Sequence, residues 1–210
     1  MSAPEPGWVA PELAEELPAL GIFTTTVDTD AGRSPPALKE KLRELSDRFR
    51  GAQAINLRQQ PIPWAYRVFF RHIGLDPDTT RTPVEQVALD RMHDGRFKSR
   101  NRMLDALTLA VAESGVAVQA FDAGALKGRL GIRAAEEDEH FEGRTTPLAA
   151  GTLVVADEER PVSILFGAMA PSAEPGRHTM RVTLAAVRVK GVPDIAIEEA
   201  LWLGESALQA

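Results

Sequence analysis

The stretch "YRVFFRHIGLDPDTTRTPVEQVALDRM", Tyr66 to Met92, joins two segments of helical periodicity through a dense set of stop and start signals. Gly74 is placed to end the first helix, and the Asp-Pro pair that follows turns the chain. The letters TPVE, from Thr82, then provide an N-cap, a first-turn proline and an acidic residue at the positive end of the next helix dipole. The stretch is therefore predicted to form a rigid corner between two helices. The apolar positions at helical spacing before the turn are Trp64, Val68, Phe69 and Ile73.

The chain outside this corner divides into an early helical part and a later part rich in strand patterns. Residues 1–10 are expected to form a loose tail, and the proline-containing segment 56–65 is expected to be a connector. Helical patterns cover 11–18, 34–51, 64–74, 82–95, 101–115 and 195–208, with Ser34 as the cap and Gly51 as the end of the second. Strand patterns cover 22–27, 116–126, 128–135, 152–157, 162–169 and 178–191. This order predicts a single α+β domain over residues 1–210, with helices around a mixed, largely antiparallel sheet.

Composition narrows the classes of function. The values of 44% hydrophobic and 26% charged residues are those of a globular protein. The sequence contains no cysteine, which excludes a disulfide, a thiol nucleophile and a thiolate zinc site. A net charge of −6 argues against avid, sequence-independent binding to polyphosphate. The absence of a signal-peptide pattern and of a bilayer-spanning apolar run favours a soluble, cytoplasmic protein without a membrane partner.

The usual sequence signatures of catalysis and of cofactor binding are missing. The four histidines are scattered and lack metal-ligand spacing, so no metal site is expected. There is no G-x-S-x-G nucleophile elbow, and the glycines from Gly124 to Gly131 match neither phosphate-binding loop pattern. No cofactor is implied. Acidic runs near His140 and Asp157 are expected to be solvated turns.

One basic segment stands out in this acidic chain. The letters "RMHDGRFKSRNR" contain Arg91, Arg96, Lys98, Arg100 and Arg102. The segment is either a solvated loop between helices or a patch that contacts the phosphates of a nucleic acid. Charge alone leaves both interpretations open.

The order of several motifs over residues 62–190 resembles the B3/B4 tRNA-editing domain of the phenylalanyl-tRNA synthetase beta chain, and especially its free-standing relatives. The segments that carry the resemblance are "WAYRVFFRHIGLDPDTTRTPVEQVALDRMHDG", "NRMLDALT", "VQAFDAGALKGRLGIRAAEEDEHF" and "GTLVVADEERPVSILFGAMAPSAE". The resemblance implies a partly barrel-like sheet of the B3/B4 type. It also implies hydrolysis, in trans, of the ester bond of wrongly charged tRNA, with the aminoacylated 3′ end of tRNA as the partner. Such hydrolysis needs a placed water, donors to the developing oxyanion and a selective pocket, so a missing triad is no objection.

The resemblance also implies candidate site residues at the matching positions of this sequence. The residues matched to catalysis are Asn101, Asp105, Gln119, Asp122, Gly167 and Ser172. Those matched to substrate binding are Phe121, Arg133, Glu139 and Ala168. The basic segment, from Arg91 to Arg102, is the expected tRNA contact. Each has an alternative structural interpretation: a helix cap for Asn101, a core position for Phe121, an ion pair for Arg133 and a plain tight turn for Gly167.

Some positions depart from the family pattern. Gln119 stands where the synthetase has a histidine, and glutamine cannot act as a general base near neutral pH. Thr108 replaces the second asparagine of the helix motif, and Asp138 replaces the glycine before Glu139. A changed specificity or a loss of catalysis is therefore compatible with the sequence. The alternatives are a non-catalytic module that binds tRNA or an aminoacylated end, and a family member with a protein–protein role. The oligomeric state stays open, with a homo-oligomer as one option.

Overall fold

The corner between α4 (Pro61–His72) and α5 (Pro83–Asp94) is built as the sequence predicts. In the computed structural model, which describes residues 3–29, 32–49 and 56–210, Thr82 and Glu85 form a complete capping box at the start of α5. The Thr82 backbone N–H donates to Glu85 Oε2 at 3.2 Å. Gly95 ends the helix with φ +71°, a conformation that glycine adopts without a steric penalty.

A buried arginine holds this corner from the other helix. Arg67, on α4, is 4% exposed and donates to Glu85 Oε1 at 2.6 Å and to Asp78 Oδ1 at 2.7 Å. Arg58 Nε lies 3.0 Å from the same Glu85 oxygen. Because a buried charge is stable only when it is paired and hydrogen-bonded, this cluster fixes the angle between α4 and α5.

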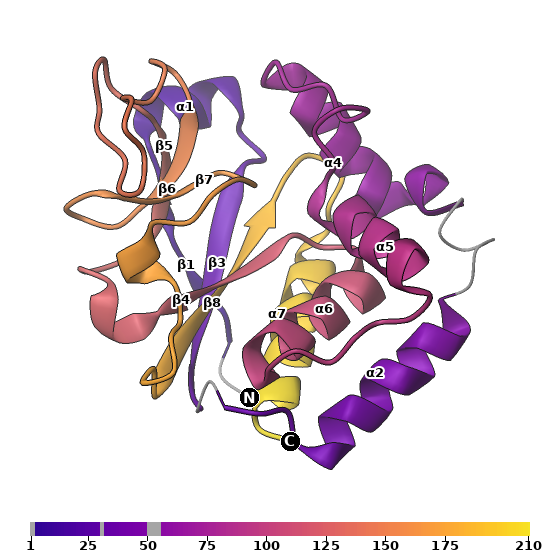
Figure 1. Cartoon of the computed structure of the whole chain (residues 1–210). Coiled ribbons are helices and arrows are strands. Elements are labelled where there is room, and N and C mark those ends of the chain that lie inside the picture. The colour runs from indigo at the N-terminus through magenta and orange to yellow at the C-terminus, as the bar shows by residue number, and fades with distance from the viewer. Residues whose placement is uncertain (1–2, 30–31, 50–55) are drawn as a thin grey trace.

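The strands form two four-stranded sheets, and helices flank them (Figure 1). The first sheet has the order β1-β3-β8-β4 and is antiparallel throughout. The second has the order β2-β5-β6-β7, with β2 parallel to β5 and the other pairs antiparallel. The α+β class and the mixed, largely antiparallel pairing are thus confirmed. The described strands are divided between two sheets, neither of which closes on itself.

The strands of the first sheet are β1 (Glu5–Pro6), β3 (Gly21–Asp28), β8 (Arg181–Arg188) and β4 (Val118–Asp122). Those of the second are β2 (Trp8–Val9), β5 (Gly131–Ala134), β6 (Leu153–Ala156) and β7 (Pro161–Ile164). The remaining α-helices are α1 (Pro11–Glu16), α2 (Pro36–Arg48), α6 (Arg102–Ser114) and α7 (Asp194–Leu208). Short 3₁₀ turns are η1 (Leu57–Gln59), η2 (Ala123–Ala125) and η3 (Pro171–Ala173).

The N-terminal segment joins the two sheets. Residues 5–6 and 8–9 lie in the stretch expected to be a loose tail, yet they form β1 in the first sheet and β2 in the second. Gly7 lies between them and donates its N–H to Ile22 O at 2.8 Å. A Cβ at Gly7 would lie 2.3 Å from Leu130 O, so no larger residue fits at the crossing.

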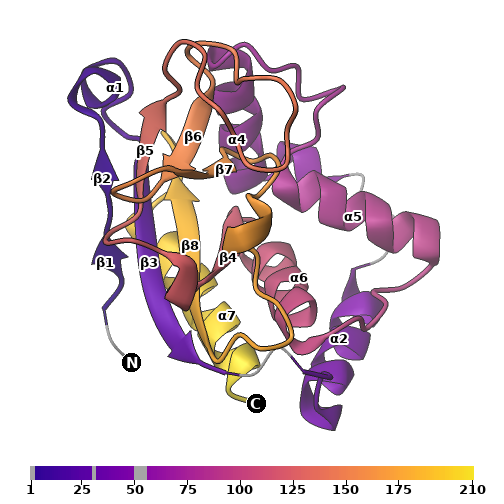
Figure 2. The ribbon, with the colours of Figure 1, turned by 60° about the vertical axis from the view of Figure 1, so that its left-hand side comes forward.

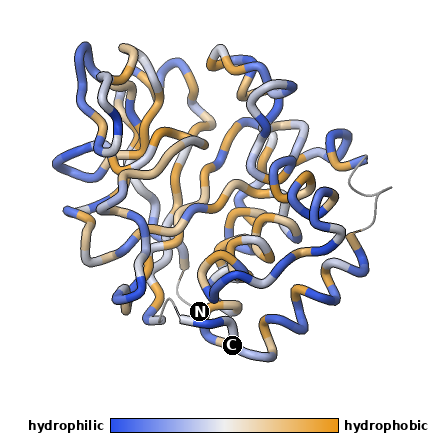
Figure 3. The backbone as a smooth tube through the Cα atoms, viewed as in Figure 1, coloured by the Kyte–Doolittle hydropathy of each residue, from blue (hydrophilic) through white to orange (hydrophobic). Residues whose placement is uncertain are grey.

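Helices α6 and α7 pack side by side against the first sheet (Figure 2). At Gly204, on α7, a Cβ would lie 2.8 Å from Leu184 Cδ1 on β8, so this glycine permits the close approach of helix and strand. Apolar residues gather along the strands and along these two helices, whereas α2 alternates between polar and apolar (Figure 3). The α6–α7 layer thus packs against the first sheet, and α2 and α5 pack against α6. The hydrophobic core continues through buried residues of the second sheet, such as Ile132 and Val155.

Tyr66 connects α4 to this core. Its hydroxyl donates to Val187 O at 2.5 Å and accepts from the Ala117 N–H at 3.1 Å. Complete burial raises the pKa of the Tyr66 phenol above its ordinary value, because the charged form would lose its hydration. The phenol therefore serves as a neutral crosslink between α4 and the strands.

Two further local predictions were wrong. Segment 56–65 is helical rather than a connector, because Pro61 and Pro63 occupy the first turn of α4, where a missing N–H costs nothing. Ser34 does not cap α2, whose N-cap is Pro35 without a side-chain bond. On α4, Trp64 and Val68 are 50% and 48% exposed, because the buried face contains Tyr66, Arg67, Phe69 and Phe70. The predicted helix end at Gly51 lies outside the described residues.

Candidate functional site: a cleft beside a basic groove

A cleft of about 310 Å³ opens between the start of α6, strand β4 and the chain that follows β7. Two of the predicted site residues, Asn101 and Gln119, line it together. Asn101 is the N-cap of α6, and its side-chain oxygen accepts from the Leu104 N–H at 2.8 Å. The other lining residues are Met103, Leu104, Leu107, Val118, Ala120, Met169, Glu174 and Pro175. The cleft is thus mostly apolar, with a few polar groups, which is the usual character of a small-ligand site.

Gln119 is held by a serine from the other sheet. Gln119 Nε2 lies 3.2 Å from Ser163 Oγ, so a residue of β4 is bonded to a residue of β7. The Ser163 hydroxyl lies 2.8 Å from Ile164 O and 3.5 Å from Gln119 Oε1, and it donates its single hydrogen at the shorter distance. Ser163 is completely buried, and nothing in the sequence singled it out. The carboxamide oxygen of Gln119 consequently can still accept a hydrogen bond from another donor.

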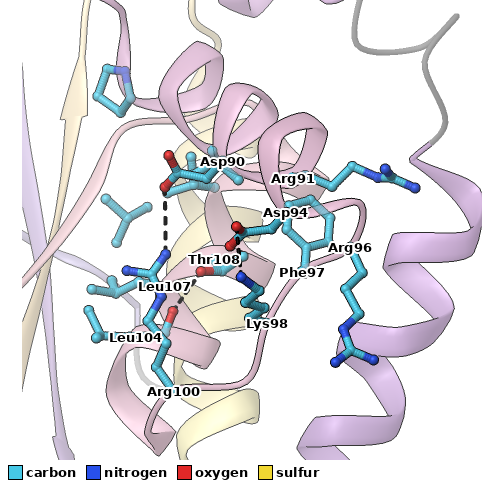
Figure 4. Close-up of a pocket in the computed structure, with 14 residues that line it drawn as sticks. Asp90, Arg91, Asp94, Arg96, Phe97, Lys98, Arg100, Leu104, Leu107 and Thr108 are labelled. Carbon is cyan, nitrogen blue, oxygen red and sulfur yellow. Dashed lines mark hydrogen bonds and ion pairs between the residues drawn. The ribbon is translucent and has the colours of Figure 1, made fainter.

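A groove of about 210 Å³ adjoins this cleft. Leu104, Leu107 and Val118 line both cavities, so the two share a wall. Four of the five predicted tRNA-binding residues line the groove, namely Arg91, Arg96, Lys98 and Arg100 (Figure 4). Thr108 lines it as well, and its hydroxyl donates to Leu104 O at 2.8 Å. The basic segment is therefore placed next to the cleft.

Carboxylates of α5 pair with two of these cations. Lys98 Nζ lies 2.8 Å from Asp94 Oδ1, and Arg100 Nη2 lies 3.5 Å from Asp90 Oδ2 (Figure 4). The hydrogen bond from Lys98 lowers the pKa of the Asp94 carboxyl, so this carboxyl is ionised at neutral pH. Both cationic side chains are more than half exposed. These pairs orient the cations toward the groove and stay accessible to solvent.

The remaining basic residues have different surroundings. Arg91 donates to Ser46 O at 3.1 Å and so ties α5 to α2. In Figure 4 the side chains of Arg91 and Arg96 extend away from the pair of Lys98 and Arg100. Arg102 does not line the groove, and its backbone N–H donates to Gly32 O at 3.0 Å. The structure thus brings together a cationic pair rather than five equivalent cations.

Asp105 supports the segment that carries this pair. It is 1% exposed and accepts from the Ser99 hydroxyl at 2.6 Å, from the Arg100 N–H at 2.8 Å and from the Ser34 hydroxyl. Asp105 lines neither of the two cavities. It therefore fixes the turn into α6, and with it the backbone of Arg100.

The turn after β7 leads directly into the lining of the cleft. The Gly167 N–H donates to Ile164 O and the Ala168 oxygen accepts from the Ile164 N–H, both at 2.8 Å. These bonds close a tight hairpin turn, and Met169, the next residue, lines the cleft. Ser172 donates to Glu142 through its hydroxyl and also through its N–H, at 3.0 Å. The hydrogen bond from Ser172 and then that from Arg160 lower the pKa of Glu142.

The other predicted residues lie apart from the cleft lining. Asp122 accepts from the Thr179 hydroxyl at 2.6 Å and from the Gly124 N–H at 2.9 Å, at the end of β4. Phe121 is fully buried in the core. Arg133 Nη1 donates to Glu139 Oε2 at 2.8 Å, and this hydrogen bond lowers the pKa of the Glu139 carboxyl. The two side chains form a mostly buried ion pair at the end of β5.

The acidic turn at Asp157 is not the solvated loop that the sequence suggested. Asp157 is 3% exposed and accepts from the N–H groups of Lys127, Glu159 and Arg160, each at 2.9 Å. It therefore organises two turns at one end of the second sheet. His140, in the other acidic run, is exposed. Among residues 3–29, 32–49 and 56–210, no group of three His, Asp or Glu side chains is arranged to hold a metal ion.

Comparison with known proteins identifies the family. Residues 65–186 match the B3/4 domain, which is found in the phenylalanyl-tRNA synthetase beta subunit. No curated protein matches the chain. No helix in the described part of the chain is long and apolar enough to cross a membrane. Every residue that lines the cleft or the basic groove lies within the matched region. The chain belongs to the B3/4 domain family.

Proposed function

We propose that this protein is an aminoacyl-tRNA editing hydrolase, which binds the charged 3′ end of tRNA and clears mischarged species in trans. The observation that carries the proposal is the shared wall of the two cavities at Leu104, Leu107 and Val118. A nucleic-acid backbone needs cations, whereas an aminoacyl ester needs a small, partly apolar pocket. The basic groove and the cleft supply these two environments side by side.

Gln119 is the residue that we assign to the attacking water. Since its N–H is directed to Ser163, its carboxamide oxygen is left to accept a hydrogen bond from that water. The water oxygen forms a bond to the ester carbonyl carbon, the bond from that carbon to the ribose oxygen breaks, and a proton passes to the ribose oxygen. An amide does not change protonation near neutral pH, so Gln119 orients the water and does not remove its proton.

The other parts of the cleft have separate roles in this proposal. We assign Asn101 to contact with the terminal adenosine, because it lines the cleft while its oxygen caps α6, which leaves its amide nitrogen as the donor. Met103, Leu107 and Met169 provide an adaptable apolar surface for the amino-acid side chain or the base. Asp105 and Asp122, which are bonded to neighbouring loops, position the walls of the site.

A non-catalytic module that binds tRNA or an aminoacylated end is the second candidate. Two observations favour this second candidate. Gln119, rather than a histidine, lines the cleft, and the carboxylates of Asp105 and Asp122 already accept hydrogen bonds from neighbouring loops. Both candidates predict binding, and they differ in whether the ester is cleaved.

The test is a panel of correctly and incorrectly charged tRNAs offered to the purified protein. Release of an amino acid above the uncatalysed rate, from at least one mischarged tRNA, supports the hydrolase. Binding without release across the panel supports the second candidate, and the absence of both contradicts both. Gln119→Ala should reduce release by about tenfold or more, since the loss of one positioning hydrogen bond typically has that effect. Glu159→Gln, an exposed change in the Asp157 turn, is the control.

A further inference from the structure

We infer that Glu174 recognises the α-ammonium group of the aminoacyl ester, which makes a free α-amine a requirement of the substrate; this inference rests on the proposed function. Glu174 lines the cleft together with Gln119 and Asn101. Among the described residues that line this cleft, it is the one with an ionisable side chain.

The carboxylate of Glu174 is free to bind a ligand. The structure shows no hydrogen bond or ion pair to it from the described residues, whereas the nearby Glu142 is bonded to Ser172 and Arg160. Its backbone is nevertheless well placed, because η3 ends at Ala173, whose N–H donates to Ala170 O at 2.9 Å. Ala173 is fully buried, and Pro175 follows Glu174 directly. The side chain thus projects from a fixed turn.

The order of charges along the two cavities matches that of the ligand. The groove contains four cationic and two acidic side chains, and the adjoining cleft contains the single carboxylate of Glu174. The 3′ end of an aminoacylated tRNA carries negative phosphates, then a neutral ribose ester, and then one positive α-ammonium group. If the phosphates of the ligand bind in the groove and its ester lies beside Gln119, its α-ammonium group enters the cleft that Glu174 lines.

The chemistry favours this assignment over a structural role. An α-amino group has an ordinary pKa of about 7.7–8.0, so it is charged under mildly acidic conditions. Hydrogen bonds between charged partners are stronger than neutral ones, and the exposed Glu174 side chain is accessible to such a partner. An N-blocked amino acid lacks the positive charge and has a bulkier, neutral group in its place. Glu174 would therefore distinguish free aminoacyl esters from N-acylated esters and from esters of hydroxy acids.

The experiment compares two esters of the same mischarged tRNA, one with a free α-amine and one N-acetylated, at about pH 6, where the amine is protonated. The wild-type protein should cleave the free-amine ester with a kcat/KM about tenfold or more above that of the N-acetyl ester. Glu174→Gln should lower kcat/KM for the free-amine ester by about tenfold and leave that for the N-acetyl ester within about twofold. Glu199→Gln, an exposed change of the same type on α7, should leave both values unchanged.

The outcomes separate this inference from the proposed function. If Glu174→Gln lowers both values equally, or neither, Glu174 does not recognise the amine, although the hydrolase stands. If the wild-type protein cleaves neither ester, the hydrolase fails. The inference is then decided by the binding of stable 3′-amide analogues of the aminoacylated end, with and without the α-amine. The inference is supported if the wild-type protein binds the analogue with the free amine more tightly and Glu174→Gln abolishes this preference. Equal binding of the two analogues by the wild-type protein overturns the inference.

Discussion

Gln119 on β4 and Ser163 on β7 are joined by a hydrogen bond of 3.2 Å, which connects the two sheets at the wall of the cleft. The serine hydroxyl donates onward to Ile164 O, and the bond to Ser163 restrains the amide of Gln119, a residue that lines the cleft. A neutral amide in a defined orientation is suited to position a water or a carbonyl, and this relationship leads to the first prediction.

Ser163→Ala should lower the rate of ester release by about tenfold, because the Gln119 amide loses its anchor and the water is held less well. The free energy of unfolding should fall by about 1 kcal/mol, the usual contribution of one hydrogen bond. Single-turnover kinetics and urea denaturation measure the two effects. Ser206→Ala, on α7, is the matched control, and an unchanged rate in Ser163→Ala would remove the positioning role from this pair.

Changes in the groove should act on binding and on its dependence on salt. Replacing Lys98 and Arg100 by glutamine should weaken tRNA binding and reduce the slope of log K against log salt by about one for each phosphate that the variant no longer neutralises. Asp90→Asn together with Asp94→Asn should have the opposite effect, because these carboxylates compete with phosphate for the two cations. Filter binding over a series of salt concentrations measures both. Equal slopes in all variants would show that the groove does not bind phosphates.

The α4–α5 corner should depend on Arg67 for stability. Arg67→Met leaves Glu85 buried with Arg58 as its cationic partner, and breaking a buried ion pair in this way typically costs about 3–5 kcal/mol. Arg71→Met removes an exposed charge from the same helix, where the guanidinium lies 5.8 Å from the Trp64 ring, and should cost less than about 1 kcal/mol. Urea denaturation of the two variants provides the comparison. A similar decrease in both would mean that the corner is held by packing rather than by Arg67.

The Arg133–Glu139 pair should make stability depend on pH in the acidic range. The hydrogen bond from Arg133 lowers the pKa of Glu139 in the folded state. Because the pKa is lower in the folded state, Glu139 contributes to the free energy of unfolding. This contribution is fully present above the pKa of the unfolded state, about 4.3, and is lost as the pH falls through the pKa of the folded state. The difference in unfolding free energy between wild type and Glu139→Gln should therefore shrink below about pH 4. A difference that stays constant over this range for Glu139→Gln would contradict the coupling between Arg133 and Glu139.

Local signals in the sequence predicted much of the fold because they act over a few residues. The capping box at Thr82, the Asn101 cap and the glycine ends at Gly95 and Gly115 are all present in the structure. The strands of the later half also lie where alternation places them. The short strands β1 and β2 were not predicted. Two residues are too few for a periodic pattern, and the strands with which they pair are distant in sequence.

The candidate site was less accessible to sequence reasoning, because it depends on pairing between distant residues. Gln119 and Asn101 were among the predicted residues, but the partner Ser163 carries no local signature and acquires its role from the meeting of two sheets. Asp157 was expected to lie in a solvated turn, yet it is buried and accepts hydrogen bonds from a loop that is distant in sequence. The resemblance to an editing domain pointed to residues 62–190 as the region of the site. The structure then shows which of the predicted residues line the cleft and which, such as Asp105, hold the neighbouring loops.

The position of the N-terminal strands sets an order of events during synthesis. β2 pairs with β5 through Trp8 and Gly131, and β3 pairs with β8 through Gly21 and Arg188. Neither pairing is available until the later partner has left the ribosome, so β2 and one side of β3 stay unpaired in the nascent chain while the helical region is made. Until their partner strands are synthesised, these unpaired strands therefore need to be covered by another molecule in the cell.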